Sequence, residues 1–135
     1  MCTITVVRYR IQLRKANAII ARMSDEKSEI QYDDFAKLDI RVGTVVAAEM
    51  VPETDKLIKC TIDFGDFGIR TIVSGIAEWK KPEELLGKQL PYVVNLAPRM
   101  LRGVESQGML LAASDDAGVA LLHPERPLQS GTKLK

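Results

Sequence analysis

The sequence has few of the residues from which catalytic and metal sites are built. Its 135 residues include one histidine, His123, and two cysteines, Cys2 and Cys60. His123 has no cysteine or histidine at metal-ligand spacing, and a nucleophilic catalytic centre would have to be built around this single histidine. A nucleophile elbow, a phosphate-binding loop and a dinucleotide fingerprint are also lacking. We therefore expect a non-catalytic protein that uses no metal and no cofactor.

Long apolar runs are absent as well. No stretch approaches the roughly 18 residues needed to cross a bilayer, and none has the apolar centre of a secretory signal. Cys60 lies in an apolar alternation typical of a buried thiol, and Cys2 is far from it, so a disulfide framework is not expected. We expect a soluble, cytoplasmic chain, whose 46% hydrophobic content suffices for the core of one domain.

Charge is nearly balanced in total, at +1, but it is unevenly distributed. Residues 1–22 carry five basic residues and no acid, which leaves 14 basic against 18 acidic residues in the remainder. A nucleic-acid binder of this composition has to gather its bases on one face, because the overall field of the domain repels phosphate.

Three segments are predicted along the chain. Residues 1–22 form a basic N-terminal extension, 23–31 a polar leader, and 32–135 the folded domain. Because Met23 opens a hydrophilic stretch typical of a protein start, one hypothesis is that it is the native initiator. A basic arm for RNA and an organelle transit peptide are the alternatives for residues 1–22.

Hydrophobic periodicity predicts a mainly β fold. Gly43 interrupts the first strand, and the apolar residues resume on the opposite parity, which predicts a glycine bulge. Short helices are expected at 32–37 and 79–87, the second with proline in its first turn. The expected strands are 38–47, 58–64, 69–75, 88–95 and 109–113, followed by a short strand at 119–122 and an extended piece at 131–135.

Five strands with a helix between the third and the fourth match the order of an OB-fold Greek-key barrel. In that fold the ligand lies across strands two and three, bounded by the loops between strands one and two and between strands four and five. Six residues scattered in the sequence then map to one groove: Lys56, Lys59, Arg70, Ser74, Arg99 and Arg102. This grouping favours nucleic-acid binding.

Residues 95–109, NLAPRMLRGVESQGM, have the composition of a binding loop. Arg99 and Arg102 suit phosphate, Asn95 and Ser106 offer neutral donors and acceptors, and Met109 offers an apolar surface to a base. Ordinary turn chemistry with solvated arginines is the competing interpretation, because no single residue here compels a function.

A family resemblance is carried by motifs in one order along residues 32–135. The chain resembles the tRNA-binding domain of the methionyl-tRNA synthetase C-terminal and beta-subunit type, in a superfamily that includes structure-specific tRNA-binding proteins and the chaperone CsaA. The motifs are 35–43 (FAKLDIRVG), 55–57 (DKL), 73–76 (VSGI), 82–87 (PEELLG), 95–99 (NLAPR) and 102–109 (RGVESQGM).

The resemblance implies a homodimeric OB fold that grips the outer surface of tRNA without reading the anticodon. It would raise the tRNA affinity of a methionyl-tRNA synthetase catalytic chain, in cis or in trans. A CsaA-like chaperone for unfolded polypeptide is the alternative function, and a signalling or scaffold protein is a third. The tRNA contacts implied by the motifs are Lys56, Ser74, Asn95, Arg99, Arg102, Ser106 and Met109.

One position departs from the family pattern. Members of the family often carry a lysine directly after the arginine that matches Arg99, and this chain has Met100 there. The substitution predicts one phosphate contact fewer, for which Arg102 is the nearest replacement.

Overall fold

The computed structural model describes residues 26–135. The predicted extension 1–22 and residues 23–25 lie outside the described residues, and residues 26–31 are exposed and carry no helix or strand. From Asp33 to Lys135 the chain is one compact unit, and the following description concerns this unit. No helix of the described residues is long and apolar enough to span a membrane.

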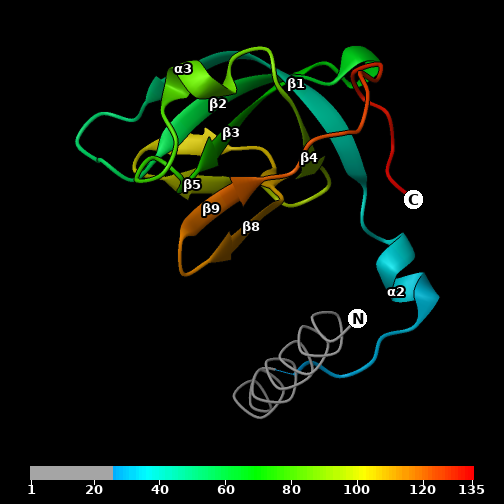
Figure 1. The fold of residues 1–135 in the computed structure, drawn as a ribbon. Coiled ribbons are helices and arrows are strands. Elements are labelled where there is room, and N and C mark those ends of the chain that lie inside the picture. Colours follow the sequence, from blue (N-terminus) through cyan, green and yellow to red (C-terminus); the bar gives the residue numbers. More distant parts are fainter. Residues whose placement is uncertain (1–25) are drawn as a thin grey trace, which may run out of the picture. The chain divides into compact units, whose positions relative to one another are not determined.

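Five antiparallel strands form the main sheet, in the spatial order β3-β2-β1-β4-β7. Figure 1 shows them curled into a barrel, with the β8–β9 hairpin projecting from one end. The predicted mainly β, OB-type barrel is confirmed. The strands of this sheet are β1 (Ile40–Met50), β2 (Ile58–Asp63), β3 (Ile69–Ser74), β4 (Gln89–Val93) and β7 (Met109–Leu110).

The long strand β1 pairs with β4 through its first half and with β2 through its second half. Its bulge lies between Val45 and Ala47, so Val46 is the extra residue, and the prediction of a bulge at Gly43 is wrong. Gly43 has a packing role instead. A Cβ there would lie 2.3 Å from Ile62 and 2.7 Å from Phe64, so only glycine lets β1 pack this closely against the core.

Buried apolar residues alternate along β2, and β4 buries four residues in a row, so both strands fill the barrel with apolar side chains. Phe64 and Tyr92 meet edge to face, with ring centroids 5.6 Å apart, a favourable geometry for aromatic pairs. Cys60 is 4% exposed, as its alternation predicted. Burial raises the pKa of its thiol from 9.0 to about 11, because the thiolate is poorly solvated there.

Two side chains close the barrel at the free edge of β3. The Ser106 hydroxyl accepts a hydrogen bond from the Val73 amide at 3.0 Å and donates one to the Gly108 carbonyl at 3.1 Å. Gln107 accepts from the Thr71 amide with its side-chain oxygen and donates its own amide to the Thr71 carbonyl. We call Ser106 and Gln107 the clasp, because they satisfy backbone groups that an edge strand otherwise leaves unpaired.

The C-terminal segment 128–134 lies along the outside of β1. Backbone hydrogen bonds join Gly131 and Thr132 to Val42, and Leu134 to Ile40. Arg41 reinforces the attachment: its guanidinium donates to the Gly131 carbonyl at 2.9 Å and pairs with Asp39 at 2.9 Å. The extended piece predicted at 131–135 therefore adds a partial strand to the sheet.

Several predicted boundaries shift in the structure. The first helix, α2, is Tyr32–Ala36. Helix α3 is Pro82–Leu85, shorter than predicted, because its first turn begins at the proline. At this end of the helix the Lys81 amide donates a hydrogen bond to the Glu84 carboxylate at 2.9 Å. This bond lowers the pKa of Glu84. A 3₁₀ turn (η1, Gly65–Phe67) joins β2 to β3. The predicted strand 109–113 divides into β7 and β8 (Ala112–Asp115), and β8 pairs with β9 (Gly118–Leu121).

The clasp makes a testable contribution to stability. Ser106→Ala leaves the buried Val73 amide without a partner, so we expect the free energy of unfolding to fall by about 1–3 kcal/mol. Ser114→Ala is the control, because Ser114 is exposed, and it should change stability by less than about 0.5 kcal/mol. Urea denaturation of both variants measures the difference. Equal stabilities would show that the hydroxyl does not hold the edge of β3.

The buried thiol predicts a pH dependence. Between pH 9 and 11 the unfolded chain releases the Cys60 proton that the folded chain retains, so the unfolded state binds fewer protons and stability falls as pH rises. The full effect is at most about 2.7 kcal/mol. Urea denaturation of the protein and of Cys60→Val from pH 8 to 10.5 should show a steeper decline for the protein. Parallel curves would contradict the assignment.

Candidate nucleic-acid interface

The stretch expected to be a loop contains a β-hairpin. Strands β5 (Arg99–Leu101) and β6 (Val104–Ser106) pair as an antiparallel ribbon, and Arg102 and Gly103 form its two-residue turn. Both turn residues have positive φ, 50° and 81°, as a type I′ hairpin turn requires. An arginine is unusual at the first of these positions, so the residues alone do not predict the turn.

The two faces of the hairpin differ. Because directly paired residues point to the same side, Arg99 shares a face with Ser106, which is buried against β3. The opposite face carries Met100, which is 63% exposed, and Glu105. Arg99 therefore lies on the barrel side of the ribbon. Met100, at the position where the family often has lysine, points away from the barrel and lies beside Glu105.

Asn95 is engaged with the backbone at the start of β1. Its side-chain oxygen accepts from the Asp39 amide at 2.8 Å, and its side-chain nitrogen donates to the Lys37 carbonyl at 2.6 Å. The Val94 amide also donates to the Asp39 carbonyl at 2.8 Å. These bonds fix the point from which the chain enters the hairpin, so Asn95 has a clear structural task.

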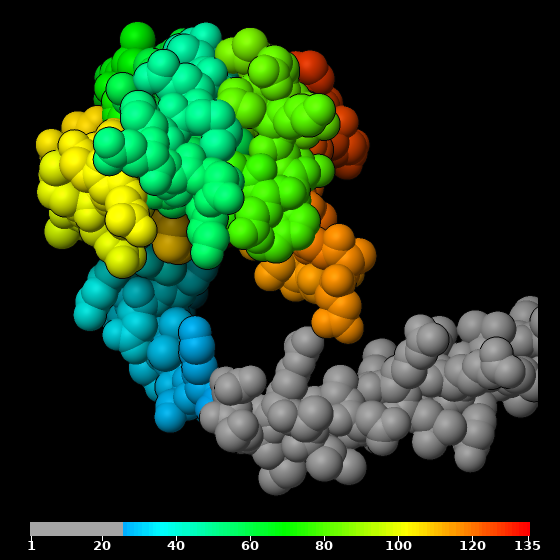
Figure 2. All heavy atoms as spheres, turned by 90° about the vertical axis from the view of Figure 1, so that its left-hand side faces the viewer, coloured from blue at the N-terminus to red at the C-terminus, as the bar shows by residue number. Residues whose placement is uncertain are grey.

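Ser74 and Met109 come together at one hollow. Met109 is 47% exposed at the start of β7, and Ser74 is half-buried at the end of β3. With the β8–β9 hairpin they line a hollow of about 280 Å³, here called the β3–β7 hollow. Figure 2 shows this face: the yellow β5–β6 hairpin, the blue-green turn between β1 and β2 and the green segment around α3 lie above the orange β8–β9 hairpin.

The structure divides the basic residues that the sequence assigned to one groove. Lys56 is exposed in the turn between β1 and β2, and its carbonyl accepts from the Ala77 amide at 3.2 Å, next to the β3–β7 hollow. Lys59 pairs with Glu49 at 3.3 Å. Arg70 is a register partner of Ile62 and so shares the core side of the sheet, where it donates to the Val94 carbonyl. The expectation that Lys59 and Arg70 share one face is wrong.

The structural role of the clasp residues was not predicted from the sequence. Ser106 was expected to contact RNA, yet it is 4% exposed and its hydroxyl has two backbone partners. No role was predicted for Gln107. The available signal was a pair of polar residues, Ser106 and Gln107, between two predicted strands that a closed barrel has to join. The next residue, Gly108, packs closely against β4: a Cβ there would lie 2.9 Å from the Val93 carbonyl oxygen.

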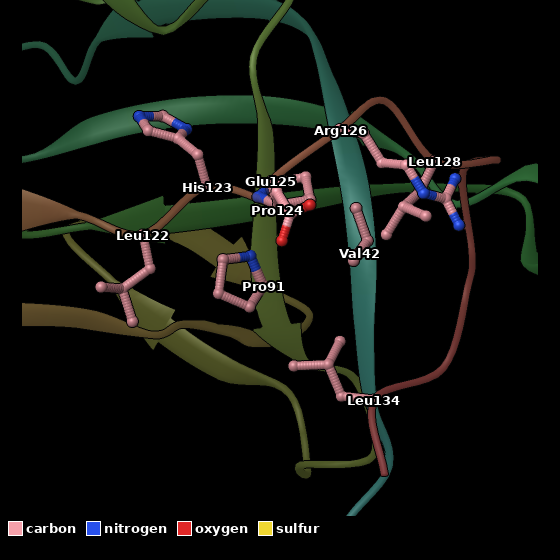
Figure 3. A pocket seen from close by; sticks show the side chains of 9 residues that line it. All are labelled: Val42, Pro91, Leu122, His123, Pro124, Glu125, Arg126, Leu128 and Leu134. Carbon is pink, nitrogen blue, oxygen red and sulfur yellow. The ribbon is translucent and has the colours of Figure 1, made fainter.

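A second hollow lies outside the barrel, between β1, β4 and the C-terminal segment. Its volume is about 430 Å³, and its lining is mostly apolar. Figure 3 shows Val42 and Pro91 on the strands with Leu122 and Leu134 beside them. His123 lies at this hollow too, with Nδ1 3.4 Å from the Gln89 carbonyl. Within residues 26–135 no three histidine, cysteine, aspartate or glutamate side chains gather as a metal site would require.

Comparison with known proteins gives close relatives. The chain is 50% identical over 110 residues to the methionine–tRNA ligase of Bacteroides fragilis and 53% identical over 107 residues to that of Deinococcus radiodurans. These matches cover 81% and 78% of this chain but only 16% of each ligase. The chain therefore spans about a sixth of the length of these relatives.

Solved structures share the fold over their whole length. The MetRS related protein from Pyrococcus horikoshii superposes with a TM-score of 0.76 at 43% identity, covering 81% of this chain and 100% of the other. The chaperone CsaA from Bacillus anthracis gives 0.73 at 35% identity, covering 80% and 100%. Residues 40–133 match the family model described as a putative tRNA binding domain. The resemblance read from the motifs is confirmed, and the chain belongs to the family of putative tRNA binding domains.

Proposed function

We propose that this domain binds tRNA by its shape and backbone and carries out no catalysis itself. The observation that carries the proposal is the β5–β6 hairpin. It holds Arg99 and Arg102 exposed on a two-stranded ribbon that the clasp fixes to the barrel. Guanidinium groups held this way are suited to phosphate oxygens, and double-stranded RNA is recognised mainly through its shape, phosphates and 2′-hydroxyls.

The candidate contacts divide into two groups. Asn95 and Ser106 act by positioning, since their polar atoms are used by the backbone of β1 and β3. The exposed or half-exposed residues are left to meet the RNA itself. These direct contacts are Lys56, Ser74, Arg99, Arg102 and Met109.

The domain would act on a methionyl-tRNA synthetase by raising the local concentration of tRNA. The ligases it matches contain this region within one long chain. A tethered second contact makes the next binding step intramolecular and strengthens overall affinity without new contacts at the active site. The same effect works in trans where the domain associates with a separate catalytic chain. A cytoplasmic location follows from this role.

A second copy of the chain is the proposed occupant of the outer hollow. Leu122 and Leu134 are 49% and 37% exposed at its rim, next to the buried Val42 and Pro91. Apolar surface of this kind gains free energy when a partner covers it. A homodimer would also double the cationic surface offered to one tRNA.

The competing function is binding of unfolded polypeptide, and the same outer hollow is the observation that favours it. An extended peptide with apolar side chains would find there a mostly apolar lining of about 430 Å³. Such binding would depend little on salt, whereas binding through phosphate contacts weakens steeply as salt rises. Salt dependence therefore separates the two functions.

The hairpin prediction concerns Arg99→Ala combined with Arg102→Ala. Removing two phosphate contacts should weaken tRNA binding at least about tenfold and lower the salt slope of log K by roughly 1.5. Fluorescence anisotropy of tRNA titrated with the full chain at two salt concentrations measures both quantities.

The matched control is Lys133→Ala combined with Lys135→Ala, which removes the same charge from exposed positions at the C-terminal end. It should leave affinity within about twofold, because the charges are remote from the hairpin. Equal losses in the two double variants would show that only net charge matters. Undiminished binding by the arginine variant would assign the tRNA contact to another part of the chain.

The dimer prediction concerns Leu122→Glu. A carboxylate at a buried subunit contact is poorly solvated, so sedimentation equilibrium at micromolar concentration should give a dimer for the protein and a monomer for the variant. Leu86→Glu is the control, since Leu86 is 50% exposed and lies at the end of α3. A monomeric parent protein would remove the homodimer from the proposal.

A further inference from the structure

We propose that the β3–β7 hollow binds one unpaired base of the RNA, so that the domain holds a splayed-out nucleotide in addition to the phosphate backbone. The inference rests on the proposed function and assigns a ligand to one part of its surface. It draws on the size of the hollow, on the hydroxyl groups in its lining, and on the charges on either side of it.

The size of the hollow suits one base. Its volume of about 280 Å³ lies just below the roughly 300–1,000 Å³ of pockets that take drug-sized ligands. Gly75 and Ala112 keep it open, whereas Ile76 and Val119 supply apolar walls. Met109 stands at the rim, 47% exposed. Its polarisable thioether is a suitable surface for a flat aromatic ring.

Two hydroxyl groups in the lining have no partner. Ser74 and Ser114 both line the hollow, and neither hydroxyl makes a hydrogen bond within residues 26–135. The serines that serve the fold differ from them: Ser106 is bonded to two backbone groups, and Ser130 to the Thr44 hydroxyl at 2.7 Å. A hydroxyl both donates and accepts, so the pair can meet the polar edge of any base.

Two cationic residues have their backbones next to residues that line the hollow. The Lys56 carbonyl is bonded to the Ala77 amide, directly after the lining residue Ile76. Arg99 is the register partner of Ser106, whose hydroxyl is bonded to the amide of Val73 in the lining. Both residues are exposed, so in this proposal their long side chains can reach the phosphates on either side of a base in the hollow.

The acids at the tip of the neighbouring hairpin do not line the hollow. The Asp115 carboxylate accepts from the Ala117 amide at 2.9 Å and so closes the turn between β8 and β9.

An apolar peptide side chain fits the lining less well than a base does, because it would cover two hydroxyl groups without giving them partners. Recognition of RNA through splayed, unstacked bases is a general mode of single-strand binding.

The β8–β9 hairpin offers a matched pair of variants. Ala112 lines the hollow and is paired with Leu121, which packs against the core, so Ala112 lies on the core-facing side of the hairpin. Ala120 belongs to the next pair, with Ala113, on the opposite face, and is not itself part of the lining. Both alanines are exposed, so a larger side chain at either position does not crowd the core. Ala112→Leu fills the hollow, and Ala120→Leu adds the same atoms outside it.

We expect Ala112→Leu to weaken binding of tRNA by the full chain about tenfold, the loss of roughly one base contact. The salt slope should stay unchanged because no phosphate contact is removed. Ala120→Leu should bind within about twofold of the parent protein, and equal melting temperatures would show that both variants are folded. Equal affinities of the two variants, or a reduced salt slope in Ala112→Leu, would overturn the proposal.

Nuclear magnetic resonance with the four ribonucleoside monophosphates locates the base directly. Shifts of the Gly75, Met109 and Ser114 amides that are absent with inorganic phosphate and absent in Ala112→Leu would support the hollow. If tRNA binds but no mononucleotide moves these amides, the hollow holds no base and the tRNA module stands. If the parent protein binds no tRNA, the proposed function itself fails. If these amides shift only when an apolar peptide is added, and not with any mononucleotide, the hollow binds polypeptide and the proposal is wrong.

Discussion

The clasp of Ser106 and Gln107 is the constraint on which the rest of this domain depends. β3 has only one strand neighbour in the sheet, and the amides of Thr71 and Val73 on its free edge find their acceptors in these two side chains. Without them the barrel is an open sheet with an exposed edge, which costs unpaired backbone groups and invites pairing with other chains. Ser106 ends β6 and Gln107 follows it, so closing the barrel also fixes the backbone of the hairpin that carries the arginines.

Polar residues in the segment 95–109 therefore perform two different tasks. Asn95 and Ser106 spend their hydrogen bonds on the backbone and set the geometry of the hairpin. Arg99 and Arg102 keep their guanidinium groups for solvent or a ligand. Fixing the backbone of the hairpin leaves less conformational freedom to be lost when these cations meet a phosphate.

The two hollows differ in chemistry as well as position. The hollow on the outer side of β1 and β4 is mostly apolar and is bordered by the C-terminal segment, which suits a polypeptide surface. The β3–β7 hollow is smaller, holds two hydroxyl groups that have no hydrogen-bond partner among residues 26–135, and adjoins the arginine hairpin. The two hollows share no lining residue, so the proposed assembly and the proposed RNA binding do not compete for the same residues.

Sequence periodicity located most strands of the main sheet and the burial of Cys60, because side-chain alternation is a local property of a strand. It did not show the β5–β6 hairpin or the division of residues 109–113 into β7 and β8. Motifs also identified the family. Local patterns did not reveal that Ser106 and Asn95 face the protein, that Lys59 and Arg70 point to opposite sides of the sheet, or that Val46 is the bulged residue. Each of these depends on which distant strand lies opposite, and pairing between segments far apart in the chain is decided only when the barrel closes.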